Sequence, residues 1–211
     1  MIASNLLGTY VVTKIYNRDF LLKYQLSFPQ DMIYEDVYWM GLLNCYVHSI
    51  GFIEERLYHY FINPDSVSQS LNVSQHWDIM KVNRLVWKEY EKRGLLGDEL
   101  QDALSYDLLC TYYLTAVKMI FLRFDEIPYD MFYMIQKDIK RMIPNYAQNP
   151  YIEEYTKPFN KLLLECIDKE LNHEQLKKIG QIMKKLAGEY KASLKEGEHH
   201  VKTANNSMYY S

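Results

Sequence analysis

The sequence has few cysteines, and none at the spacing that metal or redox sites use. Cys45, Cys110 and Cys166 are far apart, odd in number and form no C-x-x-C pair. This pattern disfavours a disulfide framework and a zinc site, and predicts thiols that stay reduced. The six histidines do not cluster at ligand spacing either, so we predict no metal site in this chain.

The sequence also lacks long apolar runs. No stretch approaches the roughly 18 uncharged apolar residues that a membrane-spanning helix requires. The N-terminus has no basic segment followed by a long apolar one, which a secretory signal would need. Together with the reduced thiols, these absences predict a soluble, cytoplasmic protein.

Neither sign of charge dominates. Lys and Arg number 24 against 27 Asp and Glu, a formal net charge of -3. Nucleic-acid binding favours a basic surface that replaces counterions on phosphate, so we predict no nucleic-acid partner. Lys177-Lys178 and Lys184-Lys185 share one face of the last expected helix. Such a face is usually solvated. The alternative is contact with an anionic membrane surface or a lipid-linked acceptor, so we expect at most peripheral membrane contact.

The chain is rich in tyrosine and methionine. It contains 20 Tyr and 10 Met, with 48% hydrophobic and 24% charged residues overall. These proportions are typical of a globular protein and not of a disordered one. Tyrosine has an apolar face and a polar tip, so it suits cores, interfaces and sugar-binding clefts alike. A tyrosine-rich helical core is the simplest interpretation.

The first 72 residues are expected to mix strand and helix. Residues that favour strands crowd 6–16 and again 49–62, which predicts a short strand in each segment. Between them we expect two helices, over 18–24 and over 34–47. The fold class is therefore mainly α, with a short α+β part at the start.

From residue 73 onward, apolar residues recur at helical spacing. They predict an all-helical domain over 73–195, followed by a flexible tail over 196–211. Helices are expected over 74–93, 98–124, 128–143, 151–171 (with a break near Pro158) and 172–194. Asn172 and Gln175 are spaced as a capping box at the start of the last helix.

The adjacent carboxylates Glu35 and Asp36 are the most informative feature of the first domain. In the first turn of a helix, acidic side chains complement the macrodipole, so the pair has a structural explanation of its own. Its neighbours add to this. Phe28-Pro29 precedes it, Tyr34 stands directly before it, and the run LYHYFINPDSVS follows it some twenty residues later.

In order and spacing, these segments resemble the C-terminal part of the catalytic domain of bacterial family 2 glycosyltransferases, which have the GT-A fold. In that family a lysine-containing strand is followed by a Phe-Pro loop, a Tyr-Glu-Asp helix start, a Leu-Tyr-x-Tyr strand and an Asn-Pro-x-Ser-x-Ser turn. The matching residues here are 12–16, 28–29, 34–36, 57–60 and 63–68. The resemblance covers about residues 6–72, which would be the acceptor-side end of such a domain.

The resemblance implies an inverting transfer of a sugar, of the hexosyltransferase type, from a nucleoside diphosphate to an acceptor hydroxyl. Such transfers build polysaccharides and glycoconjugates. Asp36 takes the role of general base, and Glu35 shapes the acceptor pocket beside it. A sugar hydroxyl is a poor nucleophile at neutral pH, and a positioned carboxylate contributes about 10²–10⁴-fold. Because Asp36 starts a helix, we expect its pKa to be lowered.

Three aromatic residues are candidates for binding the acceptor or the diphosphate: Tyr34, Trp39 and His59. Trp39 lies about one turn after Glu35 and could stack on a sugar ring, with core packing as the alternative. His59 lies in the second expected strand, where it could reach the diphosphate. The alternative for His59 is a packed or hydrogen-bonded histidine.

One part of the family's machinery has no counterpart here. The nucleotide-binding βαβ unit and its metal-holding D-x-D motif are absent, and no D-x-D occurs anywhere in the sequence. The intact enzyme would use Mg²⁺ or Mn²⁺ to neutralise the leaving diphosphate. We therefore expect this chain to be inactive alone, as a truncated domain that binds a sugar acceptor but meets the nucleotide-sugar only together with the missing half.

The helical region is expected to orient the acceptor or to mediate dimerisation. Apolar surface left open by the missing half would allow the isolated chain to form a homodimer. The alternative to the enzyme is a non-catalytic helical interaction or oligomerisation module that retains a relic of the glycosyltransferase motif.

Overall fold

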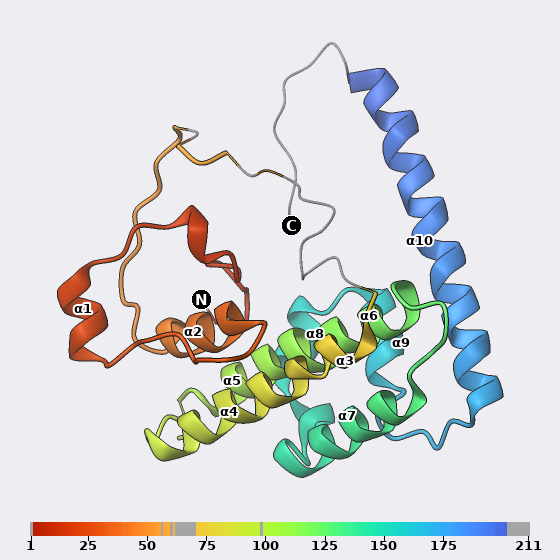
Figure 1. Cartoon of the computed structure of the whole chain (residues 1–211), viewed down its shortest axis with the longest axis horizontal. Helices are drawn as coiled ribbons and strands as arrows, with labels where there is room; N and C mark the ends of the chain where they lie inside the picture. The colour runs from red at the N-terminus through yellow and green to blue at the C-terminus, as the bar shows by residue number, and fades with distance from the viewer. Residues whose placement is uncertain (1, 56, 60, 62–70, 98, 202–211) are drawn as a thin grey trace.

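The computed structural model describes residues 2–55, 57–59, 61, 71–97 and 99–201, with side chains as far as residue 189. Within these residues the protein is mainly helical and contains no strand (Figure 1). The elements are η1 (Val11–Thr13), α1 (Arg18–Lys23), α2 (Glu35–Asn44), α3 (Val73–His76), α4 (Asp78–Lys92), α5 (Gln101–Leu108), η3 (Leu109–Leu114), α6 (Thr115–Leu122), α7 (Tyr129–Met142), η4 (Tyr146–Gln148), α8 (Pro150–Tyr155), α9 (Pro158–Leu164) and α10 (His173–Val201).

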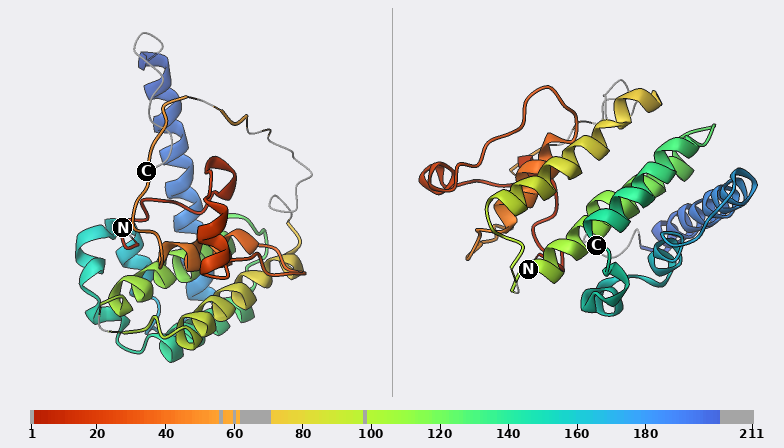
Figure 2. Two further views of the ribbon diagram at one scale, coloured as in Figure 1. Left: turned by 90° about the vertical axis from the view of Figure 1, so that its left-hand side faces the viewer. Right: turned by 90° about the horizontal axis from the view of Figure 1, so that it is seen from below.

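The centre of the molecule is one long helix made of α5, η3 and α6. Its middle part, η3, is a π-helical stretch. The side-chain hydroxyl of Thr115, the first residue of α6, donates to the carbonyl of Cys110 at 2.8 Å. Helices α4, α7 and α9 pack against η3, and α10 packs against α6. In Figure 2, α4 and α10 lie on opposite sides of this long helix.

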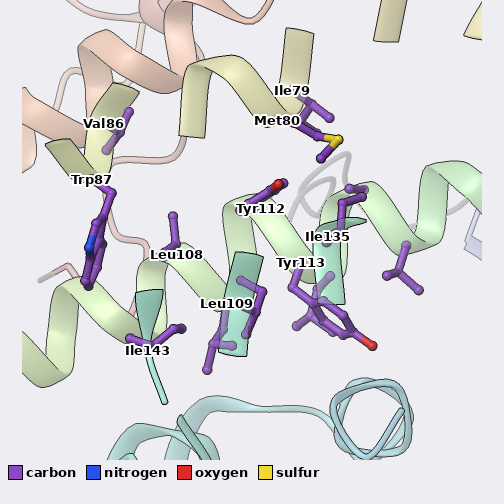
Figure 3. Close-up of a cluster of buried hydrophobic side chains, with 14 of the residues drawn as sticks. Ile79, Met80, Val86, Trp87, Leu108, Leu109, Tyr112, Tyr113, Ile135 and Ile143 are labelled. Carbon is purple, nitrogen blue, oxygen red and sulfur yellow. The ribbon is translucent and has the colours of Figure 1, made fainter. Parts of the chain in front are cut away.

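Tyrosines fill the core around η3, as the composition suggested. Tyr112 and Tyr113 are completely buried and point to opposite sides of the π-helical stretch (Figure 3). The hydroxyl of Tyr112 donates to Asp138 at 2.6 Å, and that of Tyr113 donates to the carbonyl of Leu163 at 3.0 Å. A buried hydroxyl needs such a partner, because losing its hydrogen bonds to water would otherwise cost about 1–3 kcal/mol.

Helix α2 lies close against α4 because Gly41 has no side chain. A Cβ at this position would stand 2.9 Å from the hydroxyl of Tyr90 and 3.3 Å from a methyl group of Val86. Tyr90 is 1% exposed, so it is packed on its other sides as well. The contact between α2 and α4 thus fixes the helix that begins with Glu35 and Asp36.

We predict that Gly41→Ala destabilises the protein by about 1–3 kcal/mol, since overpacking a filled interface forces side chains out of their rotamers. Gly188→Ala is the matched control: it lies in α10, where a Cβ meets nothing within 4 Å. Glycine loses more conformational entropy on folding than alanine does, so Gly188→Ala should be more stable than the unmodified protein by roughly 0.5–1 kcal/mol. Urea unfolding measures both. Equal stability of Gly41→Ala and the unmodified protein would contradict the close contact.

The strands expected over 6–16 and 49–62 are not confirmed. The first segment forms turns and the one-turn helix η1, and the described part of the second has no regular structure. Ile15 is 89% exposed and Phe52 is 77% exposed, so these side chains have no packed surface beneath them. Strand preference reflects packing against neighbouring strands, and the described residues offer no strand with which to pair.

The helical region agrees better with the sequence. Asn172 and Gln175 form the expected capping box, each side-chain oxygen accepting from the other's backbone N–H at 2.9 Å. The break at Pro158 is confirmed between α8 and α9, although α9 ends at Leu164 rather than near 171.

Two boundaries in this region differ from expectation. The helix predicted over 74–93 is divided into α3 and α4, and the side chain of Asn72 caps α3. The last helix continues to Val201, so 196–201 is helical rather than a loose tail, and 202–211 lies outside the described residues.

The division into domains at residue 72 stays a prediction, and one hydrophobic cluster includes residues from both sides of it.

Candidate functional site

The Tyr34-Glu35-Asp36 segment forms the start of α2. Tyr34 adopts a left-handed conformation, with φ 67° and ψ 28°, which turns the chain sharply into the helix. Glu35 is exposed, whereas Asp36 is half-buried, and one of its carboxylate oxygens accepts from the backbone N–H of Val37 at 2.8 Å. The two carboxylates therefore have different surroundings although they are neighbours in sequence.

The pKa of Asp36 is raised, not lowered as its place at a helix start had suggested. Burial is the largest cause, and the nearby charge of Glu35 adds to it. The N–H of Val37 acts in the opposite direction but does not outweigh the burial. The expectation was wrong because it considered only the helix end and not the loss of water around the carboxyl group.

Asp78, at the start of α4, ties down the loop that leads into α2. One of its carboxylate oxygens accepts from the backbone N–H of Ile33 at 3.2 Å, and the other accepts from Lys81 at 2.6 Å. Ile33 directly precedes Tyr34, so this contact across 45 residues fixes where the Tyr34-Glu35-Asp36 segment begins. Asp78 is thus a positioning residue for the site.

The ring of Tyr34 belongs to a buried polar chain. Arg123 donates to Nε2 of His76 at 3.4 Å, and Nδ1 of His76 lies 2.5 Å from the hydroxyl of Tyr34. Arginine can only donate, so Nε2 of His76 accepts. The ring proton of His76 is therefore on Nδ1, which donates to the oxygen of Tyr34. That leaves the Tyr34 proton for the sulfur of Met119 at 3.4 Å. This chain links the start of α2 with α3 and α6.

Trp39 lies in the core. It is 4% exposed, its ring stacks on Phe28 at 4.7 Å, and the edge of Tyr16 meets it at 4.5 Å. The packing alternative therefore describes Trp39, because both of these neighbours cover ring surface that a sugar would need. Phe28 of the Phe-Pro pair serves the same packing.

His59 lies apart from the carboxylate pair. It is exposed, and its segment runs away from the helices as an irregular loop (Figure 1). Tyr60 and the turn over 63–68 lie outside the described residues. The structure therefore brings Tyr34, Glu35 and Asp36 together and does not bring His59 to them.

His76, Arg123 and Asp78 are the residues that sequence reasoning missed. Their contacts to the Tyr34 segment span 42 residues or more, so no local spacing indicates them. Arg123 carries the one available signal, because a single arginine within the apolar run MIFLRF predicts a polar partner inside the fold.

The arrangement sets one half-buried carboxylate, Asp36, beside an exposed one, Glu35, and a half-buried carboxylate with a raised pKa is a group that can accept a proton. No group of three or more His, Cys, Asp or Glu side chains in the described part of the chain is placed to hold a metal ion. The resemblance assigns the divalent ion to the D-x-D motif of the missing half and not to these residues. Asp36 remains as a half-buried carboxylate on a fixed backbone.

A second carboxylate with a perturbed pKa lies outside this site. Asp107, near the end of α5, is half-buried close to Cys45, Tyr90 and Cys110. Burial raises its pKa to about 7. The pKa of both thiols is also raised by burial, to about 12 for Cys45 and about 11 for Cys110, so neither is a nucleophile at neutral pH.

We predict that Asp107→Asn stabilises the protein at pH 8 but not at about pH 4. The pKa of Asp107 is higher in the folded than in the unfolded protein. Between about pH 4 and 7 the carboxyl is therefore protonated in the folded protein but ionised in the unfolded one, and stability falls as the pH rises through this range. A shift from 3.8 to about 7 corresponds to about 4 kcal/mol, and residual access to water reduces the expected gain to about 2 kcal/mol.

Urea unfolding across this pH range measures the effect. The exposed Asp102→Asn, on the same helix, serves as the control. An identical pH dependence in Asp107→Asn and the unmodified protein would contradict the assignment.

Within the described residues, no helix is both long and apolar enough to span a membrane. No family model, curated protein or solved structure matches this chain.

Proposed function

We propose that this chain is the acceptor-side end of an inverting family 2 glycosyltransferase, with Asp36 as the general base. The observation that carries the proposal is the environment of Asp36. Its carboxyl is half-buried at the start of α2, and burial raises its pKa toward the working pH. A general base works best when its pKa lies near that pH, so this shift suits the role better than a lowered pKa would.

The proposed step is a single displacement. The acceptor hydroxyl attacks the anomeric carbon of the donor sugar, its proton passes to the Asp36 carboxylate, and the nucleoside diphosphate departs with the electron pair of the broken bond. Glu35, exposed beside Asp36, is free to accept hydrogen bonds from other hydroxyls of the acceptor. Asp78 and the Tyr34–His76 contact keep the backbone of this segment in place.

Exposed apolar side chains support the incompleteness of the catalytic domain. Among the described residues, twelve of the eighteen large exposed hydrophobic side chains lie within the first 71 positions: Leu6, Tyr10, Val12, Ile15, Leu22, Phe28, Phe52, Ile53, Leu57, Tyr58, Phe61 and Leu71. Soluble proteins rarely expose this many large apolar side chains in one segment without a partner. The nucleotide-sugar-binding part of a GT-A domain is the proposed cover for this segment.

The second candidate is a non-catalytic helical interaction module. The same exposed apolar side chains favour it, because they would equally serve an unrelated partner or a second copy of the chain. The two candidates differ in whether Asp36 has any chemical role.

An activity assay on a reconstituted enzyme separates them. The segment encoded immediately upstream of Met1 is expressed together with this chain, and release of nucleoside diphosphate from nucleotide-sugars is measured with and without glycan acceptors. The enzyme proposal expects an upstream βαβ unit with D-x-D and acceptor-dependent release, whereas this chain alone releases nothing. An unrelated upstream segment and no release would favour the interaction module.

A further inference from the structure

A cavity of about 600 Å³ lies between α4 and α7, on a different part of the molecule from Asp36. Both helices pack on η3, and each presents one face to the cavity. On α4 this face carries Arg84, Trp87, Lys88 and Glu91, at the i, i+3, i+4 and i+7 spacing of a single helix face. The volume is in the range of small-molecule sites.

Cationic side chains dominate the lining. Arg84 and Lys88 come from α4, and Lys137 and Arg141 come from the facing turns of α7. Two carboxylates, Glu91 and Asp138, oppose these four cations. Neither Lys88 nor Lys137 makes an ion pair within the described chain, so both charges are available to a ligand in the cavity.

Asp138 holds the two arginines in place. It is 5% exposed, and it accepts from Nε of Arg84 at 2.6 Å, from the hydroxyl of Tyr112 at 2.6 Å and from Nη2 of Arg141 at 3.2 Å. Its charge is thus used inside the protein. Because Arg84 is held through Nε, its two Nη groups remain as donors at the cavity.

The remaining lining is apolar. Trp87 is 8% exposed, and two methionines of α7 complete the surface. A ligand here would place an anionic group among four cations and a less polar part against indole and thioether groups. Phosphate suits this setting, since arginine pairs with its oxygens through two parallel hydrogen bonds and lysine supplies a point charge.

We propose that the cavity between α4 and α7 binds the phosphate or diphosphate group of an organic phosphate. Its source is either a soluble phosphate ester or the head group of a lipid, and both present the same chemistry to the four cations. The proposal rests on the α4–α7 cavity alone and does not depend on the glycosyltransferase proposal, because binding is measured on this chain without any transfer reaction.

The test is calorimetric titration of the full chain with inorganic pyrophosphate, together with sedimentation on phosphatidylcholine vesicles with and without phosphatidic acid. The variant Lys88→Gln/Lys137→Gln removes two charges that have no partner in the described chain, so it should fold normally. Losing two charge-assisted contacts should weaken binding about tenfold or more. The control Lys23→Gln/Lys169→Gln removes two exposed charges outside the cavity lining and should bind like the unmodified protein.

Pyrophosphate binding lost in the cavity variant supports a soluble source. Binding only to vesicles with phosphatidic acid, lost in the same variant, supports a lipid head group. No binding of either probe would overturn the proposal. So would equal binding by the cavity variant and the Lys23/Lys169 control, because the charges would then act through net charge alone.

Discussion

Replacing Asp36 with asparagine is expected to slow sugar transfer by the reconstituted enzyme about 10²–10⁴-fold, the usual contribution of a positioned general base. Asparagine has the same shape and retains an oxygen for the N–H of Val37, so the start of α2 should persist. The loss should therefore fall on kcat rather than on the amount of folded protein. Release of nucleoside diphosphate measures the rate, and thermal unfolding checks the fold.

Two controls separate catalysis from helix capping. Asp19→Asn removes an exposed carboxylate from the first turn of α1, which is the same helical position without the motif, and should leave transfer unchanged. Glu35→Gln should have a smaller effect, because the proposed mechanism gives the exposed Glu35 a contact with the acceptor but no proton transfer. Undiminished transfer by Asp36→Asn would remove Asp36 as the base.

Asp138→Ala is expected to destabilise the folded protein by about 3 kcal/mol. The substitution leaves the completely buried hydroxyl of Tyr112 without its acceptor, at a cost of about 1–3 kcal/mol, and it breaks a 2.6 Å charge-assisted bond to Arg84. Arg84 and Arg141 both keep access to water, which limits the cost of the charges that lose their partner.

Urea unfolding measures this loss, with two comparisons. Tyr112→Phe removes only the hydroxyl and should cost less, about 1 kcal/mol. Asp130→Ala removes an exposed carboxylate from the first turn of α7 and should cost at most a few tenths of a kcal/mol beyond its helix-end effect. A loss from Asp138→Ala no greater than that from Asp130→Ala would show that the buried network contributes little.

Local sequence patterns predicted the helical region well. The Asn172–Gln175 capping box and the break at Pro158 are confirmed, because both depend on groups within a few residues of one another. The expected strands over 6–16 and 49–62 depend on partners elsewhere in space, and the described chain provides none. A strand preference without a neighbouring strand specifies no structure.

In the candidate site, too, the local features were predictable from the sequence and the contacts between distant residues were not. The sequence placed Tyr34, Glu35 and Asp36 together at a helix start, which the structure has. It could not reveal the contacts with His76 and Asp78, since these form only when α3 and α4 fold against α2. The sign of the Asp36 pKa shift followed from burial, which is set by that packing and not by the helix end.

The anomeric configuration of the product tests the account most directly. Proton NMR of the glycoside formed by the reconstituted enzyme reports whether the sugar-to-acceptor bond has the opposite configuration to the bond in the nucleotide-sugar. A single displacement with Asp36 as the base predicts inversion. Retention of configuration would contradict it, because retention requires two displacements or attack from the face of the sugar that the diphosphate leaves. Asp36 would then not have the role proposed here.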